Sequence, residues 1–255
     1  MDDLKKYKRF FAFGCSMTSY RWPTWADIIA KEIPESYNFG KSGGGNLYIS
    51  TMLAEAHNHY KFSADDLVMI MWTSVCREDR YINRYWETPG NIFTQGFYDD
   101  SFVEKYSDPR GYLIRDMAII SNVKHMLDSM PCDYHMLNMA PFVTLQLRGG
   151  ESNADDFDDV LELYRDVLKY IKPDIMNLEY KGQWPQHPIS DPGNQQFDYH
   201  PSTAGHARYL QKVFPRLTFT EQQQQFIDKH EEIIMSANTT KDLEPHWMPQ
   251  SPQIL

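Results

Sequence analysis

The sequence predicts an α/β fold, a three-layer α/β/α sandwich built around a mostly parallel sheet of five strands. Two unbroken apolar runs, Phe10–Phe13 and Leu67–Trp72, are typical of strands that are buried on both faces. Segments with helical spacing of apolar residues alternate with such runs along the chain. This alternation indicates βαβ units, in which helices cover both faces of a parallel sheet.

The individual elements can be placed in chain order. The strands are expected at Phe10–Phe13, Ser36–Phe39, Leu67–Trp72, Tyr134–Met139 and Asp174–Leu178. The helices are expected at Pro23–Ile33, Leu47–Tyr60, Tyr112–Met130, Asp155–Ile171, Ser202–Val213 and Thr220–Met235. A proline lies near the start of the first helix, and Thr220 is a suitable N-cap for the last one. The proline-containing tail from Asn238 is expected to be extended.

We expect a single domain over residues 1–255, because the chain shows no internal repeat and no clear linker. An aromatic-rich insertion at about 76–112 has no clean period. Loops of this length are uncommon and often act as lids or binding loops. The alternative is an insertion that packs a small core of its own. The last helix and the extended tail occupy about 220–255.

Composition excludes several classes of protein. A formal net charge of −10 and a pI near 5.3 argue against a nucleic-acid binder, which needs clustered Lys and Arg. No apolar run approaches the ~20 residues of a membrane span. The run Phe10–Phe13 is too short for the core of a signal peptide, so we expect a cytoplasmic protein.

The three cysteines, Cys15, Cys76 and Cys132, are too sparse for a disulfide framework and match no zinc motif. They suit a reducing compartment. Cys15 lies next to a serine, and we interpret it as a small buried residue under a turn. The alternative is a thiol nucleophile.

The candidate functional residues follow the predicted strands. Ligands of such sheets bind at the carboxyl ends of the strands, which here are Gly14–Thr18, Gly40–Asn46 and Thr73–Arg77. Ser16 comes just after the first strand and ahead of a helix, where backbone N–H groups point outward. A serine hydroxyl is inert unless a base removes its proton, so a histidine is needed.

A candidate base lies late in the chain. His200 follows Asp198 by two residues, and a carboxylate so placed can orient the imidazole ring and stabilise its charged form. Asp191 is a weaker substitute for Asp198. The alternative is a surface loop in which Ser202 caps a helix and His206 is an ordinary helix residue.

Three sequence blocks resemble those of the SGNH/GDSL hydrolase family. Gly14–Thr18 (Gly-Cys-Ser-Met-Thr) resembles the Gly-Asp-Ser-x-Thr block, with Cys15 in the Asp position. Asn38–Gly43 resembles the second block, and Asp198–Pro201 the last one. The resemblance implies a flavodoxin-like sheet, with Ser16 as nucleophile. It further implies that His200 is the base, that Asp198 orients it, and that the N–H groups of Ser16 and Gly43 form an oxyanion hole.

The chain departs from the family pattern in two respects. The third block, Gly-x-Asn-Asp, lacks its Asn here, and Asn46, Thr73 and Ser74 are the candidates for the third oxyanion donor. The last block has one residue between Asp198 and His200 instead of two. Loss of one such donor typically lowers the rate ~10²–10³-fold.

The resemblance leads us to expect a serine esterase that works through an acyl-enzyme with no cofactor and no metal. The substrate would be a small-molecule or glycan ester, such as an O-acetyl group on a glycan, or a lipid-like acyl ester. Arg77, Tyr81 and Trp86 are candidate substrate-binding residues. Arg77 could bind an anionic substrate, and the alternative is a salt bridge to Glu78 or Asp79. The alternative is a catalytically impaired SGNH-fold binding or structural module. A bacteriophage source, with association to the virion, also stays open.

Overall fold

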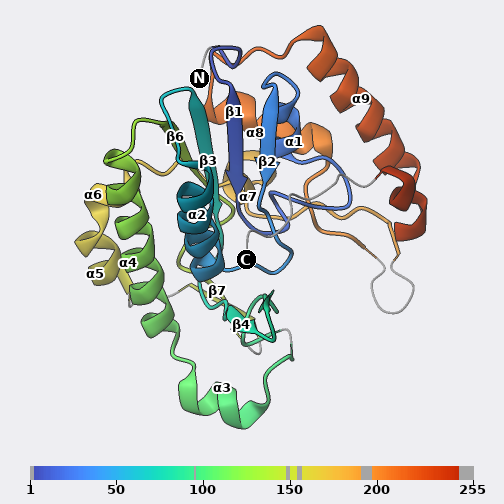
Figure 1. The fold of residues 1–255 in the computed structure, drawn as a ribbon. Helices are drawn as coiled ribbons and strands as arrows, with labels where there is room; N and C mark the ends of the chain where they lie inside the picture. The colour runs from blue at the N-terminus through green and yellow to red at the C-terminus, as the bar shows by residue number, and fades with distance from the viewer. Residues whose placement is uncertain (1–2, 95, 148–149, 154–156, 191–196, 247–255) are drawn as a thin grey trace.

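The centre of the fold is a parallel four-stranded sheet in the order β2-β1-β3-β6 (Figure 1). A computed structural model of the chain describes residues 3–94, 96–147, 150–153, 157–190 and 197–246. The sheet strands are β1 (Arg9–Phe13), β2 (Glu35–Asn38), β3 (Asp66–Trp72) and β6 (Asp133–Asn138). All three neighbouring pairs are parallel, so the carboxyl ends of the strands meet at one edge.

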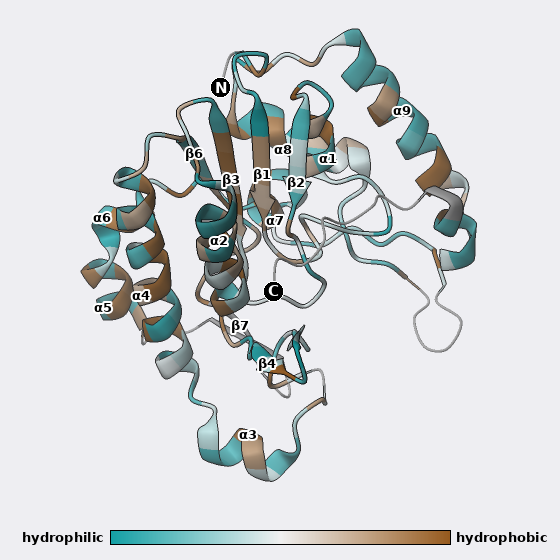
Figure 2. Cartoon of the chain, viewed as in Figure 1, coloured by the Kyte–Doolittle hydropathy of each residue, from teal (hydrophilic) through white to brown (hydrophobic). Residues whose placement is uncertain are grey.

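Alternate residues of the central strands supply two separate cores. In β1, Phe11 and Phe13 face one core, whereas Phe10 and Ala12 face the other. The first core is covered by α2 (Asn46–Tyr60), α4 (Pro109–Asp128), α5 (Asp158–Leu163) and α6 (Arg165–Leu168). The second is covered by α1 (Trp25–Ala30), α7 (Ile175–Tyr180), α8 (Thr203–Val213) and α9 (Glu221–Ser236). Figure 2 shows that β3 is largely hydrophobic, because both of its faces are buried. It also shows that α9 is of mixed character, because only one of its faces is buried. The predicted three-layer α/β/α sandwich is confirmed.

Helix α9 begins where the sequence predicts. Thr220 is its N-cap and forms a reciprocal capping box with Gln223, whose side chain accepts a hydrogen bond from the Thr220 N–H at 3.0 Å. The same Gln223 side chain donates to the carbonyl oxygen of Ile28 at 2.9 Å. This bond links α9 to α1 on the second face of the sheet.

The predicted fifth strand, Asp174–Leu178, is wrong. The segment forms α7 instead, because the Asp174 side chain accepts a hydrogen bond from the Asn177 N–H at 2.8 Å and caps a helix. Only Ile171 pairs with the sheet, through one parallel bridge to Met136. The described sheet therefore has four strands instead of five.

Two further expectations need correction. The helix predicted at Asp155–Ile171 is divided at Tyr164 into α5 and α6, and residues 154–156 lie outside the described residues. The tail is not wholly extended, because Thr240–His246 forms a 3₁₀ helix. Residues 247–255 of that predicted tail lie outside the described residues, and the expectation of a single domain stays a prediction.

The insertion at 76–112 lies beyond the carboxyl ends of the strands (Figure 1). It contains an antiparallel hairpin, β4 (Arg80–Ile82) and β5 (Tyr85–Glu87), followed by α3 (Asp100–Tyr106). Aromatic residues of the insertion such as Phe93 and Phe102 pack against the first core. The insertion is thus an extension of the main core. A second hairpin follows β6, with β7 at Thr144–Leu147 and β8 at Gly150–Asn153. Among the helices described, none has the length and apolar character to cross a membrane.

The start of α1 provides a test of the buried carboxylates. Asp27 accepts a hydrogen bond from the Thr24 N–H at 2.8 Å, and burial raises its pKa to about 6. In the unfolded chain the pKa of Asp27 is about 4. The contribution of the neutral Asp27 carboxyl group to stability is therefore fully present below pH 4 and is lost as the pH rises through 6. Asp27→Asn keeps an acceptor oxygen and removes the titration.

We therefore expect the Asp27→Asn variant to gain about 2 to 3 kcal/mol in its free energy of unfolding relative to the wild type when the pH rises from 4 to 7. Urea unfolding at each pH measures this difference. Parallel pH profiles for the two proteins would contradict the expectation.

Candidate active site

A pocket of about 610 Å³ opens at the carboxyl ends of the strands. Its lining comes from loops that are far apart in the sequence. The lining includes Ser16 and Met17 after β1, Ser42 and Gly43 after β2, Ser74 and Arg77 after β3, and Tyr199 and His200 before α8. This is the edge of the sheet at which the sequence predicts the site.

Ser16, His200 and Asp198 form a continuous row of hydrogen bonds. The Nε2 atom of His200 lies 2.9 Å from Ser16 Oγ, and its Nδ1 atom lies 2.9 Å from Asp198 Oδ1. The His200 backbone N–H also donates to Asp198 Oδ1 at 2.9 Å. A carboxylate only accepts, so Nδ1 carries the proton and Nε2 is left to accept the Ser16 hydroxyl. The structure brings together the three residues that the sequence singled out.

The turn that presents Ser16 is closed by short-range contacts. The Thr18 N–H donates to the Cys15 carbonyl oxygen at 2.9 Å. A side chain at Gly14 would place its Cβ 2.0 Å from Thr18 Oγ1, so the turn requires glycine there. Cys15 is fully buried, and its Sγ lies 3.7 Å from Met139 Sδ. This burial agrees with Cys15 as a small packing residue beneath the turn.

Tyr20 is a site residue that the sequence did not indicate. Its hydroxyl donates to Asp198 Oδ2, the carboxylate oxygen that His200 does not contact. Its ring also stacks on the His200 imidazole, with centroids 3.7 Å apart and planes 21° apart. The only signal is a tyrosine four residues after Ser16, and no spacing rule connects that position with Asp198.

Two further hydrogen bonds join the loop of Tyr20 to the loop of His200. Trp22 Nε1 donates to the Pro201 carbonyl oxygen at 2.8 Å, and Thr203 Oγ1 donates to the Pro23 carbonyl oxygen at 2.9 Å. We call these contacts between residues 20–23 and 198–203 the loop seam. The seam joins the loop that follows Ser16 to the loop that carries His200.

The environment of Asp198 favours its ionised form. Burial opposes ionisation, but the hydrogen bonds and charge of His200 and the bond from Tyr20 outweigh it, so the pKa of Asp198 lies below its ordinary value. Asp198 therefore carries the negative charge needed to stabilise an imidazolium at His200.

Two backbone N–H groups are available for an oxyanion. Gly43 has φ = 73°, and a Cβ there would lie 2.0 Å from the Thr88 carbonyl oxygen, so no other residue fits. Within the described residues, neither the Gly43 N–H nor the Ser16 N–H donates a hydrogen bond. Both residues line the pocket.

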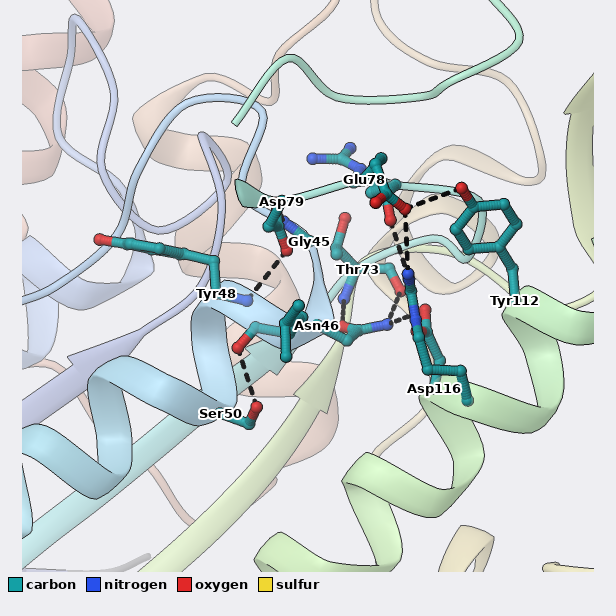
Figure 3. Close-up of polar contacts among 12 residues, drawn as sticks. Gly45, Asn46, Tyr48, Ser50, Thr73, Glu78, Asp79, Tyr112 and Asp116 are labelled. Carbon is teal, nitrogen blue, oxygen red and sulfur yellow. Dashed lines mark hydrogen bonds and ion pairs between the residues drawn. The ribbon is translucent and has the colours of Figure 1, made fainter. Parts of the chain in front are cut away.

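Of the three candidate third donors, only Ser74 lines the pocket. Asn46 is fully buried, and its Nδ2 donates to the Thr73 carbonyl oxygen at 3.2 Å and to Asp116 Oδ2 at 2.9 Å (Figure 3). Its Oδ1 accepts from the Thr73 N–H at 3.0 Å. Thr73 is fully buried as well, and its Oγ1 lies 3.6 Å from Met139 Sδ. The structure therefore places Asn46 and Thr73 behind the pocket wall.

The predicted substrate-binding residues divide in the same way. Arg77 lines the pocket, but Tyr81 and Trp86 are not part of its lining. These two rings contact each other across the β4–β5 hairpin, with centroids 5.7 Å apart. His206 is a buried residue of α8, where burial lowers its pKa to about 3. Asp191 lies outside the described residues.

Asp79 has a second role in the structure, as a helix cap, which the sequence did not indicate. Its carboxylate accepts hydrogen bonds from the Gly45 N–H at 2.8 Å and the Tyr48 N–H at 2.9 Å, as Figure 3 shows for Tyr48. Helix α2 has no side-chain cap of its own, because Gly45 is its N-cap residue. Asp79 thus caps α2 from the loop after β3 and fixes the chain that follows Gly43. Elsewhere, the described part of the chain contains no group of three His, Cys, Asp or Glu side chains that could hold a metal ion.

A scan of protein-family models and a search of curated proteins found no match to this chain. Among solved structures, it is similar to a member of the lipolytic G-D-S-L family from Veillonella parvula, with 13% identity, a TM-score of 0.42, and 82% of this chain and 99% of that chain covered. The first block of the present sequence resembles the motif that gives that family its name. It is also similar to an acetylxylan esterase from Geobacillus stearothermophilus, with 17% identity, a TM-score of 0.43, and 83% and 95% covered.

A third similar structure is an α/β hydrolase from the metagenome of Lake Arreo in Spain, with 13% identity, a TM-score of 0.47, and 85% and 100% of the two chains covered. At these identities the likeness concerns the fold alone. The function proposed below rests on the chain's own residues.

Tyr20→Phe tests the support of Asp198. A depressed pKa means that Asp198 stabilises the fold above its unfolded pKa of about 4 and loses this effect as the pH falls through the folded value. We expect the variant, which keeps the ring but loses the hydroxyl, to be less stable by about 1 to 3 kcal/mol at pH 7. The deficit should shrink below about pH 4.

Chemical unfolding of both proteins across this pH range measures the effect. Tyr37→Phe is the matched control, since Tyr37 donates to Glu35 at an exposed edge, and its loss should cost no more than about 0.5 kcal/mol. Equal deficits for the two variants would show that Tyr20 has no special role.

Proposed function

We propose that this protein is a serine hydrolase that cleaves carboxylic esters through an acyl-enzyme. The observation that supports the proposal is the row from Ser16 Oγ through both ring nitrogens of His200 to Asp198, with each step at 2.9 Å. A nucleophile, a base and an orienting carboxylate in this order form the arrangement that activates serine.

In the first half-reaction, Ser16 Oγ bonds to the ester carbonyl carbon while His200 Nε2 takes the hydroxyl proton. The carbonyl oxygen becomes an oxyanion, to which the N–H groups of Ser16 and Gly43 and the Ser74 hydroxyl would donate. When the tetrahedral intermediate collapses, the bond to the alkoxy group breaks and His200 returns its proton to the departing alcohol. Ser16 is left as an acyl ester.

In the second half-reaction, His200 takes a proton from water, and the resulting hydroxide attacks the acyl carbon. Collapse of this intermediate breaks the bond to Ser16 Oγ, which regains its proton from His200. The products are an alcohol and a carboxylic acid, and the enzyme is restored. Attack by a sugar hydroxyl in place of water would make the reaction an acyl transfer.

The Ser74 hydroxyl takes the position of third donor because of its neighbours. Arg77 Nε lies 3.4 Å from Ser74 Oγ and donates toward it, which occupies a lone pair of the oxygen. Ser74 donates its own proton to no group within the described residues. That proton is therefore free to point toward a developing oxyanion.

The substrate class follows from the lining. The pocket lining includes apolar and aromatic side chains, namely Met17, Met139, Met176, Trp184 and Tyr199. Such surface suits a short acyl group and the apolar face of a sugar ring. An acetylated glycan or a small acyl ester is thus the proposed substrate. A binding or structural module without turnover is the alternative, and the next experiment separates the two.

A fluorophosphonate probe tests the nucleophile. We expect the wild-type protein to be labelled and Ser16→Ala not to be labelled, because the probe reacts only with an activated serine. Turnover of p-nitrophenyl acetate should fall by about 10⁴-fold or more in Ser16→Ala and in His200→Ala. Ser129→Ala, in which a surface hydroxyl that donates to the Met126 carbonyl is removed, serves as the control. An unlabelled wild-type protein would favour the binding module.

Ser74→Ala tests the third donor. We expect kcat to fall by about 10²-fold with a much smaller change in KM, since the hydroxyl would act on the transition state and not on the bound ester. Steady-state kinetics on p-nitrophenyl acetate give both constants. A Ser74→Ala variant with wild-type kcat would exclude Ser74 from the oxyanion hole.

A further inference from the structure

Arg77 is a cationic side chain in the lining of the pocket, and no carboxylate of the described residues lies within ion-pair distance of it. It lines the same cavity as Ser16 and His200, and the described lining contains no Asp or Glu. The protein as a whole carries a net charge of −10, so a positive pocket is contrary to its general electrostatic character. A cation that faces a cavity without a protein partner is suited to an anionic ligand.

The hydrogen bonds of Arg77 leave much of its guanidinium group unused. Nη1 donates to the Gly44 carbonyl oxygen at 3.0 Å, and Nε points to Ser74 Oγ at 3.4 Å. Nη2 contacts only the thioether of Met139, at 3.9 Å. A guanidinium has five N–H donors in a planar fork that matches a carboxylate. Within the described residues, Arg77 has no ion pair.

The two carboxylates near Arg77 are already occupied. Asp79 accepts from the backbone at the start of α2. Asp116 accepts from Asn46 at 2.9 Å and pairs with Arg115 at 2.8 Å. Neither carboxylate lines the pocket. Within the described residues, no carboxylate is therefore hydrogen-bonded to Arg77 inside the pocket, and a bound anion can take that position.

The backbone holds Arg77 in place. The preceding Cys76 is buried and has φ = 67°, a left-handed conformation that is uncommon for a residue with a side chain. Arg77 pairs with Asn91 in an antiparallel bridge, and its carbonyl oxygen accepts from Arg115 at 2.8 Å. A Cβ at Gly45 would lie only 2.7 Å from Arg77 Cβ, so this backbone packs directly on the arginine stem. The guanidinium is thus positioned before any ligand binds.

We propose that Arg77 binds a carboxylate on the substrate, so that the pocket selects esters that carry a negative charge. That the bound substrate is an ester rests on the proposed function. The binding of an anion at Arg77 does not depend on turnover. The carboxylate can belong to the alcohol part or to the acyl part of the substrate. The two locations require separate ligands in the test.

Direct binding tests the anion site without any reaction. Isothermal titration calorimetry compares 4-hydroxybenzoate with 4-hydroxybenzamide, and adipamate with adipamide, none of which contains an ester bond. In at least one pair we expect the wild-type protein to bind the carboxylate about 10-fold or more tightly than its neutral analogue. Added salt should reduce this ratio, because it screens the charge.

The variants locate the effect. Arg77→Gln should bring the ratio close to one, and Arg77→Lys should keep part of it because it retains the charge. Arg84→Gln is the control: it removes the same charge from the exposed turn of the β4–β5 hairpin, and it should keep the wild-type ratio. No preference in either ligand pair, or a preference that survives in Arg77→Gln, overturns the proposal.

Hydrolysis of matched esters separates this inference from the proposed function. The pairs are 4-acetoxybenzoate with 4-acetoxybenzamide, and the 4-nitrophenyl monoester of adipic acid with its methyl ester. A carboxylate preference in binding without hydrolysis of any ester would refute the esterase and leave the anion site standing. If Arg77→Gln lowers kcat/KM by the same factor for both members of each pair, Arg77 acts on the reaction itself and the anion site is refuted.

Discussion

The candidate active site depends on the loop seam, which joins the loop after Ser16 to the loop of His200. Ser16 and His200 are 184 positions apart in the sequence, yet their side chains meet at 2.9 Å. Tyr20 donates a hydrogen bond to Asp198 and stacks on His200. Trp22 donates to the carbonyl oxygen of Pro201, the residue after His200. Catalysis by a positioned serine tolerates little misplacement, because an error of about 1 Å can cost 10²-fold in rate. A seam made of the buried Trp22 ring, the partly buried Tyr20 ring and hydrogen bonds provides that rigidity.

The opposite wall of the pocket depends on a buried polar network. Asn46 joins the start of α2 to the end of β3 and to Asp116 on α4 (Figure 3). Arg115 pairs with Asp116 at 2.8 Å and with Glu78 at 3.4 Å, and it also holds the backbone of the loop after β3. Burying polar groups is costly unless their hydrogen bonds are made, so each member of this network requires the others. The loops that carry Gly43, Ser74 and Arg77 are fixed as a consequence.

Local patterns allowed most of the fold to be predicted, and they failed where a cap decided the structure. The apolar runs at Phe10–Phe13 and Leu67–Trp72 become central strands because both of their faces are buried. Asp174–Leu178 also contains three apolar residues but becomes a helix, because the Asp174 carboxylate caps its first turn. A side-chain cap is a short-range hydrogen bond, and periodicity over five residues cannot report it.

The sequence by itself determined the four strands of the central sheet and the candidates Ser16, His200 and Asp198, because these depend on periodicity and short motifs. Tertiary structure alone decided which polar side chains face the pocket. Asn46 and Ser74 were equal candidates in the sequence, yet one links three elements in the interior while the other lines the cavity. Tyr20 gained its place through a contact across 178 positions. Such pairings depend on the packing of the whole chain, and no local spacing encodes them.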